Sequence, residues 1–367
     1  MSGPLLHLVE PAAWRAALAE GVLRPPSLDE DRFVHLSRPD QVHLPAGRLF
    51  PGRRDLALLV VDPARLSDPV REEPGAPDDP PGMLFPHLYG LLPTSAVVAV
   101  VPYRPPARPL LPAPDDALGR ALALYRSLPV RRAAEVRDVP GGVAVLDPRF
   151  PHSRDDNRLV LSEPVDADTV AEATAAVAAE AGWRVECAEL YWADAGAVAG
   201  ELARRGWEAS ELLVMARPAT PVPGGERAEV VDQREVHDLW DRSWRRNLPA
   251  SIPNLDEVVG QLVGREHRND TVVAVTDVVV REEGRVVAAG QLRVDGATAA
   301  VESVLTDPAA RGRGYADAVL TRILTLAAEA GCDLVVLEAD AADWPRHWYA
   351  RRGFAVVGSV WEVVAPG

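Results

Sequence analysis

Two short sequences each occur twice in this chain of 367 residues, and the copies are separated by almost the same distance. AAEAG spans 178–182 and again 327–331, and ARRG spans 203–206 and again 350–353. The AAEAG copies lie 149 positions apart and the ARRG copies 147. Two landmarks with nearly equal offsets predict a duplicated unit whose copies differ by two residues in length between the landmarks. The chain should therefore contain two related folded units, which need not share one function.

The composition is that of an ordinary globular protein with more than one domain. Apolar residues make up 47% of the chain and charged residues 25%, and 367 residues can form two or three separate cores. The N-terminal sequence MSGPLLHLVE lacks the basic segment and long apolar run of a signal peptide. No apolar stretch approaches the ~18 residues of a membrane span. We therefore expect a cytoplasmic protein that has no membrane partner.

Net charge and cysteine content indicate which ligands the protein can bind. The net charge of −15 opposes nucleic-acid binding as the main role and favours, weakly, a cationic small substrate. Cys187 and Cys332 lie far apart and belong to no CxxC or Cys/His ligand spacing. We expect two free, buried thiols and no metal site.

Two proline-rich segments, 101–116 and 217–226, divide the chain. Proline lacks a backbone N–H and fixes φ, so neither segment can continue a helix or a central strand. The predicted organisation is a first domain over 1–103, a linker over 104–116, a middle domain over 117–218 and a last domain over 226–367.

The element order of the last domain follows from its hydrophobic periodicity. Residues 271–306 alternate apolar and polar residues around the turn signals EEG and DG, which predicts antiparallel strands joined by hairpins. Apolar residues then recur at helical spacing as far as Gly331, which predicts a long helix. An apolar run over 333–340 predicts a buried strand, and a short helix and a last strand follow it. The second half of the middle domain repeats the order strand, helix, strand, helix, strand.

The sequence ARGRGYA lies between a predicted strand and the long helix of the last domain. Gly312 and Gly314 have no Cβ, so a ligand can approach the backbone there. The amides at a helix N-terminus attract anions, and Arg311 and Arg313 add positive charge. This pattern indicates a pyrophosphate cradle; a structural turn between strand and helix is the alternative.

The arrangement strand–RxxGxA–helix, with Arg311, Gly314 and Ala316 at the key positions, resembles motif A of the Gcn5-related N-acetyltransferases (GNAT). WYARRGF, over 348–354, is similar to the next motif of that family, and the resemblance runs from Ala228 to the C-terminus. It implies a mixed central sheet flanked by helices, of class α+β or α/β, with acetyl-CoA as the donor. Val304 and Thr306 would pair with its pantetheine arm. Its pyrophosphate would lie on the backbone of Arg311, Gly312, Arg313, Gly314, Tyr315 and Ala316.

The resemblance also implies direct transfer of an acetyl group to a primary amine of a small molecule or peptide. Tyr349 matches the position of the acid that protonates the leaving thiolate, and a core tyrosine is the alternative reading. We expect Glu302, on the strand before the glycine turn, to be the base that accepts the ammonium proton, or else a solvent-facing strand residue. Aromatic and acidic residues suit a cationic amine, and the candidates for the wall of the acceptor site are Trp240, Asp241 and Trp244.

The middle copy lacks each of these groups. Leu202 precedes its ARRG where the last domain has Tyr349, and SEPVDADTV, ahead of its helix, has neither glycine nor arginine. Asp166 or Asp168 should cap that helix, and a carboxylate there repels pyrophosphate. We expect a degenerate acetyltransferase-like unit in a tandem arrangement. It is either purely structural or shapes the amine site.

The first domain resembles a small bacterial family of unknown function, number 952 among such domains, which looks related to the ADP-ribosyltransferase fold. That relation implies a small α+β domain with a pocket for NAD or another nucleotide, with Glu72 or Glu73 as an acidic candidate. Histidines that only satisfy turns in a non-catalytic binding module are the alternative. The residues expected around the pocket are His7, His35, Ser37, His87 and Tyr89.

The sequence is therefore compatible with three functions. The leading one is an acetyl-CoA-dependent N-acetyltransferase. The second is a protein that binds NAD or another nucleotide, or transfers ADP-ribose, through the first domain. The third is a non-catalytic sensor of acyl-CoA. Because Tyr349 and the glycine turn are both present, the sequence favours the enzyme over the sensor.

Overall fold

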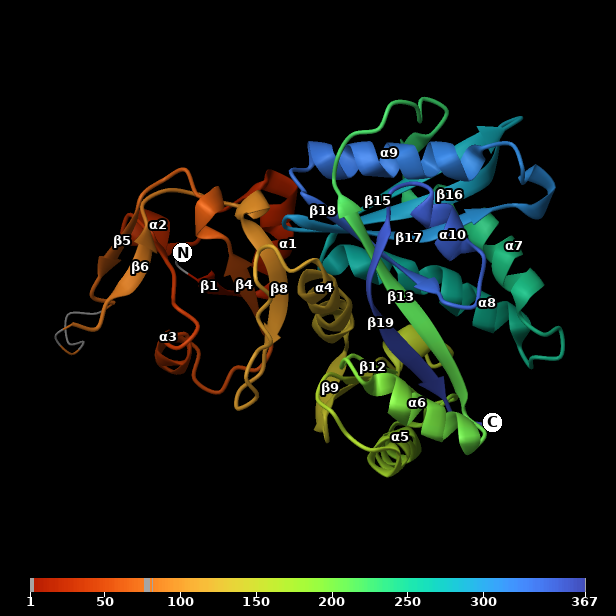
Figure 1. Ribbon diagram of the computed structural model, residues 1–367, viewed down its shortest axis with the longest axis horizontal. Coiled ribbons are helices and arrows are strands. Elements are labelled where there is room, and N and C mark those ends of the chain that lie inside the picture. The colour runs from red at the N-terminus through yellow and green to blue at the C-terminus, as the bar shows by residue number, and fades with distance from the viewer. Residues whose placement is uncertain (1–2, 76–79, 81, 367) are drawn as a thin grey trace.

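The structure, a computed structural model, describes residues 3–75, 80 and 82–366 (Figure 1). It consists of a small N-terminal part and a larger part built on one long sheet. None of the described helices combines the length and the apolar character needed to cross a bilayer. Cys187 and Cys332 are free and buried, as predicted, and burial raises the pKa of each thiol to about 12.

The N-terminal part contains three small antiparallel sheets, ordered β1–β4–β8, β3–β6–β5 and β2–β7. Trp14 on its first helix is fully buried in the core against these strands. The elements are β1 (Leu5–Val9), α1 (Pro11–Glu20), β2 (Val22–Leu23), α2 (Ser27–Glu30), β3 (Val34–His35), α3 (His43–Leu49), β4 (Leu56–Val61), β5 (Val70–Glu73), β6 (Phe85–Leu88), β7 (Leu92–Pro93) and β8 (Val97–Tyr103).

The rest of the chain forms one eleven-stranded mixed sheet with helices on both faces, which confirms the predicted class. The middle block supplies α4 (Ala117–Arg132), β9 (Glu135–Val139), β10 (Gly142–Leu146), β11 (Arg158–Leu161), α5 (Ala167–Ala181), β12 (Cys187–Leu190), α6 (Ala195–Arg204) and β13 (Glu208–Pro218). The last block supplies β14 (Glu229–Val231), α7 (His237–Asn247), α8 (Leu255–Gly264), the 3₁₀ segment η5 (Arg265–Thr271), β15 (Ala274–Glu282), β16 (Arg285–Asp295), β17 (Thr298–Thr306), α9 (Tyr315–Glu329), β18 (Leu334–Asp340), α10 (Pro345–Ala350) and β19 (Ala355–Val364).

The repeated landmarks mark equivalent helix ends in the two blocks. The first AAEAG ends α5 and the second ends α9, in each case at a glycine with positive φ, Gly182 and Gly331. The ARRG copies begin within the last turns of α6 and α10 and each ends at a glycine with positive φ, Gly206 and Gly353. The shared order strand, helix, strand, helix, strand is the one that the repeat predicts. Asp166 caps α5 by accepting a hydrogen bond of 2.8 Å from the Thr169 amide, also as expected.

The two blocks exchange their last strands. The sheet order is β14–β15–β16–β17–β18–β13–β19–β12–β11–β10–β9. β13, the last strand of the middle block, therefore lies between β18 and β19 of the last block. β19 in turn pairs with β12 of the middle block. The two long strands run side by side through the centre of the molecule (Figure 1), so the two blocks share one continuous sheet.

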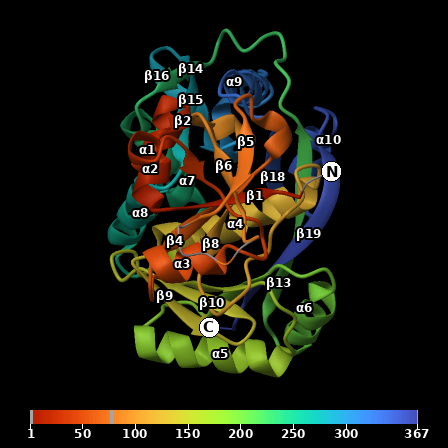
Figure 2. The ribbon, with the colours of Figure 1, turned by 90° about the vertical axis from the view of Figure 1, so that its left-hand side faces the viewer.

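Alternation along the strands gives this sheet two distinct faces. Val301, Val335 and Leu337 pack against α9 on one face. Ala300 and Val336, on the neighbouring positions, pack with residues of α4 on the other. Figures 1 and 2 show α9 and α4 on opposite sides of the sheet. Because side chains alternate with period two, Glu302 and Glu338 belong to the α4 face.

The N-terminal part docks on the tip of the β16–β17 hairpin. The Ala297 amide donates a hydrogen bond of 2.7 Å to the Val97 carbonyl, and Trp14 Nε1 donates one of 2.7 Å to Asp295. Gly296, at the hairpin tip, has φ of +77°, and a Cβ there would lie 2.3 Å from the Val97 carbonyl oxygen. Only glycine permits this approach, and the contact anchors the N-terminal part beside the central sheet.

Candidate functional site

β17 and β18 are paired only at their beginnings and then diverge. Their register runs from Thr298 opposite Leu334 to Ala300 opposite Val336. Beyond this point β17 continues along β16, with a bulge at Ser303, whose φ is +53°. Val304 and Thr306 lie on this diverging stretch, where the β18 side of the backbone has no strand partner among the described residues. We refer to this gap between the diverging strands as the opening.

The glycine turn lies at the end of β17, directly before α9. Gly312 and Gly314 have φ of +77° and +74°, values that favour glycine. Gly314 is the N-cap of the 15-residue helix α9 and brings no side-chain cap, so the first amides of α9 stay available. Arg311 lies beside the turn, where its Nε donates to the Thr306 carbonyl at 3.4 Å. Arg313 forms an ion pair with Glu282. Tyr315 and Ala316 form the first turn of α9.

Arg227 joins this turn, although the sequence analysis did not select it. Its guanidinium lies 5.4 Å from the centroid of the Tyr315 ring, and a Cβ on Gly314 would be 3.4 Å from its Nη2. We find no ion pair for Arg227 within the described part of the chain. Arg227 directly follows the predicted linker 217–226, so no sequence pattern marked it as a site residue. The turn thus brings together three arginines, Arg227, Arg311 and Arg313.

Tyr349 lies on α10, with its ring packed edge-on against Trp348 and Phe354 at centroid distances of 4.7 and 5.7 Å. Burial, and secondly the charge of Glu302, raises the pKa of Tyr349. The phenol therefore keeps its proton at neutral pH, which is the state that a general acid needs. At the corresponding place in the middle block, Leu202 is fully buried in the core.

Glu302 lies on β17, two residues beyond its last backbone pair with β18. Its side chain keeps 25% of its surface exposed, and its Oε2 is 4.0 Å from Arg293 Nη1. Burial raises the pKa of Glu302, an effect that Arg293 opposes. Arg293 is itself held by Gln291 at 2.7 Å and Glu266 at 3.1 Å. A carboxylate with a raised pKa is a stronger base than a free glutamate.

Glu338 on β18 occupies the position equivalent to Glu302 and was missed because it lies within the apolar run DLVVLEAD. Its Oε1 is buried and forms no hydrogen bond with the described residues. Burial, reinforced by the charges of Glu189 and Glu302, raises the pKa of Glu338 well above its usual range. Tyr125, on α4 of the middle block, also has a buried hydroxyl that makes no hydrogen bond with the described residues.

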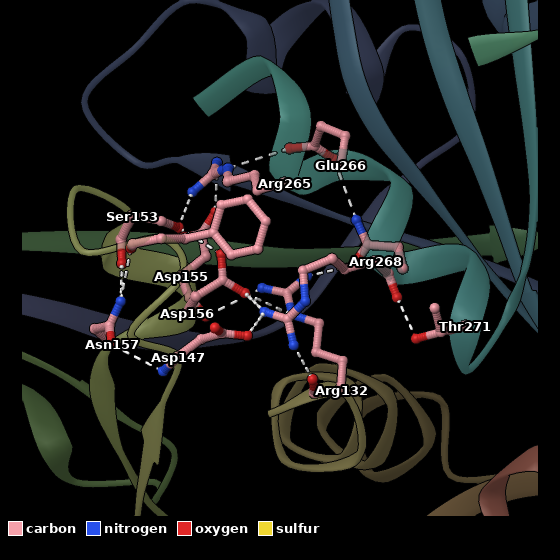
Figure 3. Close-up of polar contacts among 12 residues, drawn as sticks. Arg132, Asp147, Ser153, Asp155, Asp156, Asn157, Arg265, Glu266, Arg268 and Thr271 are labelled. Carbon is pink, nitrogen blue, oxygen red and sulfur yellow. Dashed lines mark hydrogen bonds and ion pairs between the residues drawn. The ribbon is translucent and has the colours of Figure 1, made fainter. Parts of the chain in front are cut away.

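A network of buried ion pairs joins the middle block to the last block beside these residues (Figure 3). Arg268 of η5 lies 2.5 Å from Asp147 and 2.9 Å from Asp156, both on the segment between β10 and β11. Arg265 pairs with Asp155 at 2.6 Å. Burial alone would raise the pKa of Asp155, but Arg265 and then Arg158 outweigh it and hold that pKa well below its usual range. The network fixes the middle block against the α4 face of the sheet.

The three predicted wall residues lie in different surroundings. Trp240 is 5% exposed and packs in the core between α7 and the β15–β16 strands. Asp241 pairs with Arg245 at 2.7 Å on the surface. Trp244 packs against the same core, with the Arg265 guanidinium 5.8 Å from its ring centroid. Trp244 contacts Arg265, whereas Trp240, one turn earlier on the same face of α7, is buried in the core.

The five predicted N-terminal residues come together. His7 Nδ1 lies 2.8 Å from the His35 carbonyl, the His35 and His87 rings are 5.1 Å apart, and Tyr89 donates to Glu73 at 2.7 Å. His7, His35 and Ser37 line a cavity of about 590 Å³. His87 instead stacks on Phe33 at 3.9 Å.

Two further features bear on what this N-terminal site could hold. Glu72 pairs with Arg38. Burial lowers the pKa of both His7 and His87. In the described part of the chain, no group of three or more His, Cys, Asp and Glu is placed to hold a metal ion.

Two family models match the chain. Residues 8–100 match DUF952, a protein family of unknown function, and residues 233–354 match the acetyltransferase (GNAT) family. A probable glucosamine 6-phosphate N-acetyltransferase 2 of Oryza sativa subsp. japonica is 37% identical in an alignment of 97 residues that covers 24% of this chain. The chain spans 57% of the length of that relative.

Solved structures resemble the larger part of the chain. A conserved protein of unknown function from Staphylococcus epidermidis matches with a TM-score of 0.50 and 11% identity, covering 63% of this chain and 93% of its own. A GCN5-related N-acetyltransferase from Kribbella flavida has a TM-score of 0.47 and 21% identity, covering 68% of this chain and 96% of its own. The chain thus joins a segment that matches a family of unknown function to a segment that matches the GNAT acetyltransferases.

Proposed function

We propose that this protein transfers the acetyl group of acetyl-CoA to a primary amine at the opening between β17 and β18. The observation that carries the proposal is the divergence of these strands after Ala300 and Val336, with Glu302 and Tyr349 beside it. An acid and a base at one opening in a sheet are the two proton-transfer groups that amine acetylation requires.

The glycine turn suits the anionic end of the donor. Uncapped amides at the start of α9 and the side chains of Arg311, Arg313 and Arg227 can bind pyrophosphate oxygens. Arg313 would exchange its ion pair with Glu282 for the phosphate. The pantetheine arm would then lie along the diverging stretch of β17, with Val304 and Thr306 as its backbone partners.

The reaction we propose is a direct transfer in one ternary complex. The amine nitrogen attacks the thioester carbonyl carbon, forming the N–C bond as the C–S bond breaks. Glu302 accepts the proton that the amine nitrogen loses, directly or through water. Tyr349 donates its proton to the departing thiolate. The raised pKa keeps the phenol of Tyr349 protonated, as an acid requires, and makes the ionised form of Glu302 a stronger base than a free glutamate.

The test combines donor binding with turnover. Calorimetric titration should show that acetyl-CoA binds and that Arg313→Glu weakens binding at least tenfold, because the substitution places a carboxylate beside the pyrophosphate. A panel of amines, including an amino sugar because of the rice relative's name, should then release free thiol and gain the mass of one acetyl group. Absence of acetyl-CoA binding, or binding that Arg313→Glu leaves unchanged, would refute the proposal.

For the middle block we propose an acetyltransferase-like unit that has lost catalysis. Leu202 in place of Tyr349 and the Asp166 cap in place of a glycine turn support this proposal. The N-terminal cavity supports a second candidate function, the binding of NAD or another nucleotide by His7, His35 and Ser37. A thermal-shift assay with NAD tests it: stabilisation that is lost in His35→Ala would support it, and no shift would contradict it.

A further inference from the structure

Most of the charged groups near the opening on the α4 face of the sheet pair with one another. Three of the arginines there have acidic partners: Arg158 pairs with Glu189, Arg265 with Asp155, and Arg268 with Asp147 and Asp156. The Tyr191 hydroxyl also donates a hydrogen bond to Glu189. These groups satisfy one another, so they leave no charge for a ligand to compensate.

Two carboxylates at the opening lack a close cation of this kind among the described residues. Glu338 forms no ion pair within the described residues, and its Oε1 is buried without a hydrogen bond. Among the described residues, Glu302 pairs with Arg293 at 4.0 Å, and Arg293 lies closer to Glu266, at 3.1 Å. Burial of unpaired carboxylates is costly, so proteins usually pair them.

Glu362, on the exchanged strand β19, adds a third carboxylate to the same face. It stands opposite Glu189 in the register of β12 and β19, and no ion pair of its own is found in the described part of the chain. Burial raises the pKa of Glu362, and Arg158 opposes that effect. The negative charge therefore extends from the opening toward the middle block.

An unpartnered hydroxyl lies among these carboxylates. Tyr125 is 8% exposed, and its buried hydroxyl forms no hydrogen bond with the described residues. Tyr125 packs in one buried cluster with Ala300 and Val336, the last paired residues before Glu302 and Glu338. Burial first, and then the charges of Glu302 and Glu338, raises the pKa of Tyr125 well above its usual value. An ionised carboxylate only accepts hydrogen bonds, a phenol oxygen can accept them too, and a bound cation favours the ionised form of Glu338. The group that would satisfy this site is therefore a cation with several N–H donors.

We propose that Glu338 and Tyr125 form a second ammonium subsite, so that the acceptor is a small diamine or polyamine held by one amine while the other reacts. This proposal rests on the proposed acetyl transfer. Neighbouring strands lie ~4.8 Å apart where they are paired, and β17 and β18 diverge here. An ammonium at Glu338 and a reacting amine at Glu302 would thus be separated by the span of a short-chain diamine. Tyr125 belongs to α4, which gives the middle block a role in substrate choice.

The test compares 1,4-diaminobutane with 1-aminobutane on the full-length protein. The wild type should show kcat/KM at least tenfold higher for the diamine, because only the diamine carries the second ammonium. In Tyr125→Phe and in Glu338→Gln that ratio should fall toward one. Tyr103→Phe, which alters a buried tyrosine of the N-terminal part, should leave the ratio unchanged and controls for burial and size.

A binding measurement separates this proposal from the acetyl transfer itself. If no amine releases thiol, calorimetry of the two amines in the presence of CoA still tests the subsite. Tighter binding of the diamine that both variants abolish would support it. Equal affinity for the two amines, or a diamine preference that survives both substitutions in folded protein, would overturn it, whatever the outcome for acetyl transfer.

Discussion

Glu302 on β17 and Glu338 on β18 each stand two residues beyond the last backbone pair of their strands, Ala300 opposite Val336. The two carboxylates therefore project from one face at the point where the strands part. The glycine turn, with Arg227, Arg311 and Arg313, lies beyond the far end of β17. The opening is thus positively charged at one end and negatively charged at the other, which suits an anionic donor and a cationic acceptor.

Glu338→Gln should stabilise the protein, and the gain should depend on pH. Burial raises the pKa of Glu338 above the value of 4.5 of a free glutamate, so the folded state holds this proton more tightly than the unfolded state. The wild type therefore loses stability as pH rises from 4.5 through the folded pKa, and the glutamine variant does not. Urea denaturation should show no difference between them at pH 4 and the largest difference above the folded pKa. An equal difference in stability at pH 4 and above the folded pKa would show that the gain does not come from the ionisation of Glu338.

Tyr349→Phe should lower kcat by about 10²-fold or more, because the thiolate then leaves without its proton donor. The affinity for acetyl-CoA should stay within about twofold, since the phenylalanine ring keeps the packing against Trp348 and Phe354. Steady-state kinetics and calorimetry measure the two quantities. Tyr103→Phe is the control, and undiminished kcat in Tyr349→Phe would remove Tyr349 from the mechanism.

Gly312→Ala should weaken acetyl-CoA binding, whereas Gly21→Ala should not. The two glycines are closely matched: φ is +77° and +76°, and a Cβ at either position would meet no atom within 4 Å. Each substitution should cost about 1 kcal/mol of stability through backbone strain. Only Gly312 lies at the turn before α9, so the KM for acetyl-CoA should rise about tenfold in that variant alone. Equal changes in both variants would mean that strain, and not the ligand, accounts for the effect.

Arg268→Ala should destabilise the fold by about 2 kcal/mol or more, because it removes the buried cation that Asp147 and Asp156 share and leaves each with one other arginine, Arg149 and Arg132. Arg245→Ala removes an arginine that also has two acidic partners, Asp241 and Asp256, but on the exposed surface. Its effect should be small, since solvent screens such pairs. Urea denaturation of the two variants measures the contrast, and a comparable loss in both would show that the buried network adds no special stability.

Local sequence patterns predicted much of this fold. The helix ends at Gly182 and Gly331, the Asp166 cap and the glycines before α9 each follow from short-range geometry. The placement of Glu338 and Tyr125 does not, because it depends on which face of the sheet each strand presents to α4. Trp240 shows the same dependence: an aromatic residue near the site packs in the core because of its helical phase. The strand exchange could not be predicted from local sequence either, because the apolar pattern of β13 and β19 is compatible with pairing in either block.

The exchange of β13 and β19 also sets an order of events during synthesis. β12 of the middle block needs β19 as its neighbour, and β19 is the last strand of the described chain. The middle block therefore emerges from the ribosome with an uncovered sheet edge, and that edge stays open until some 150 further residues, from 219 to 364, have been translated. Open edges invite pairing with other chains. A unit that closed its own sheet edge would be exposed to such pairing for a shorter stretch of synthesis.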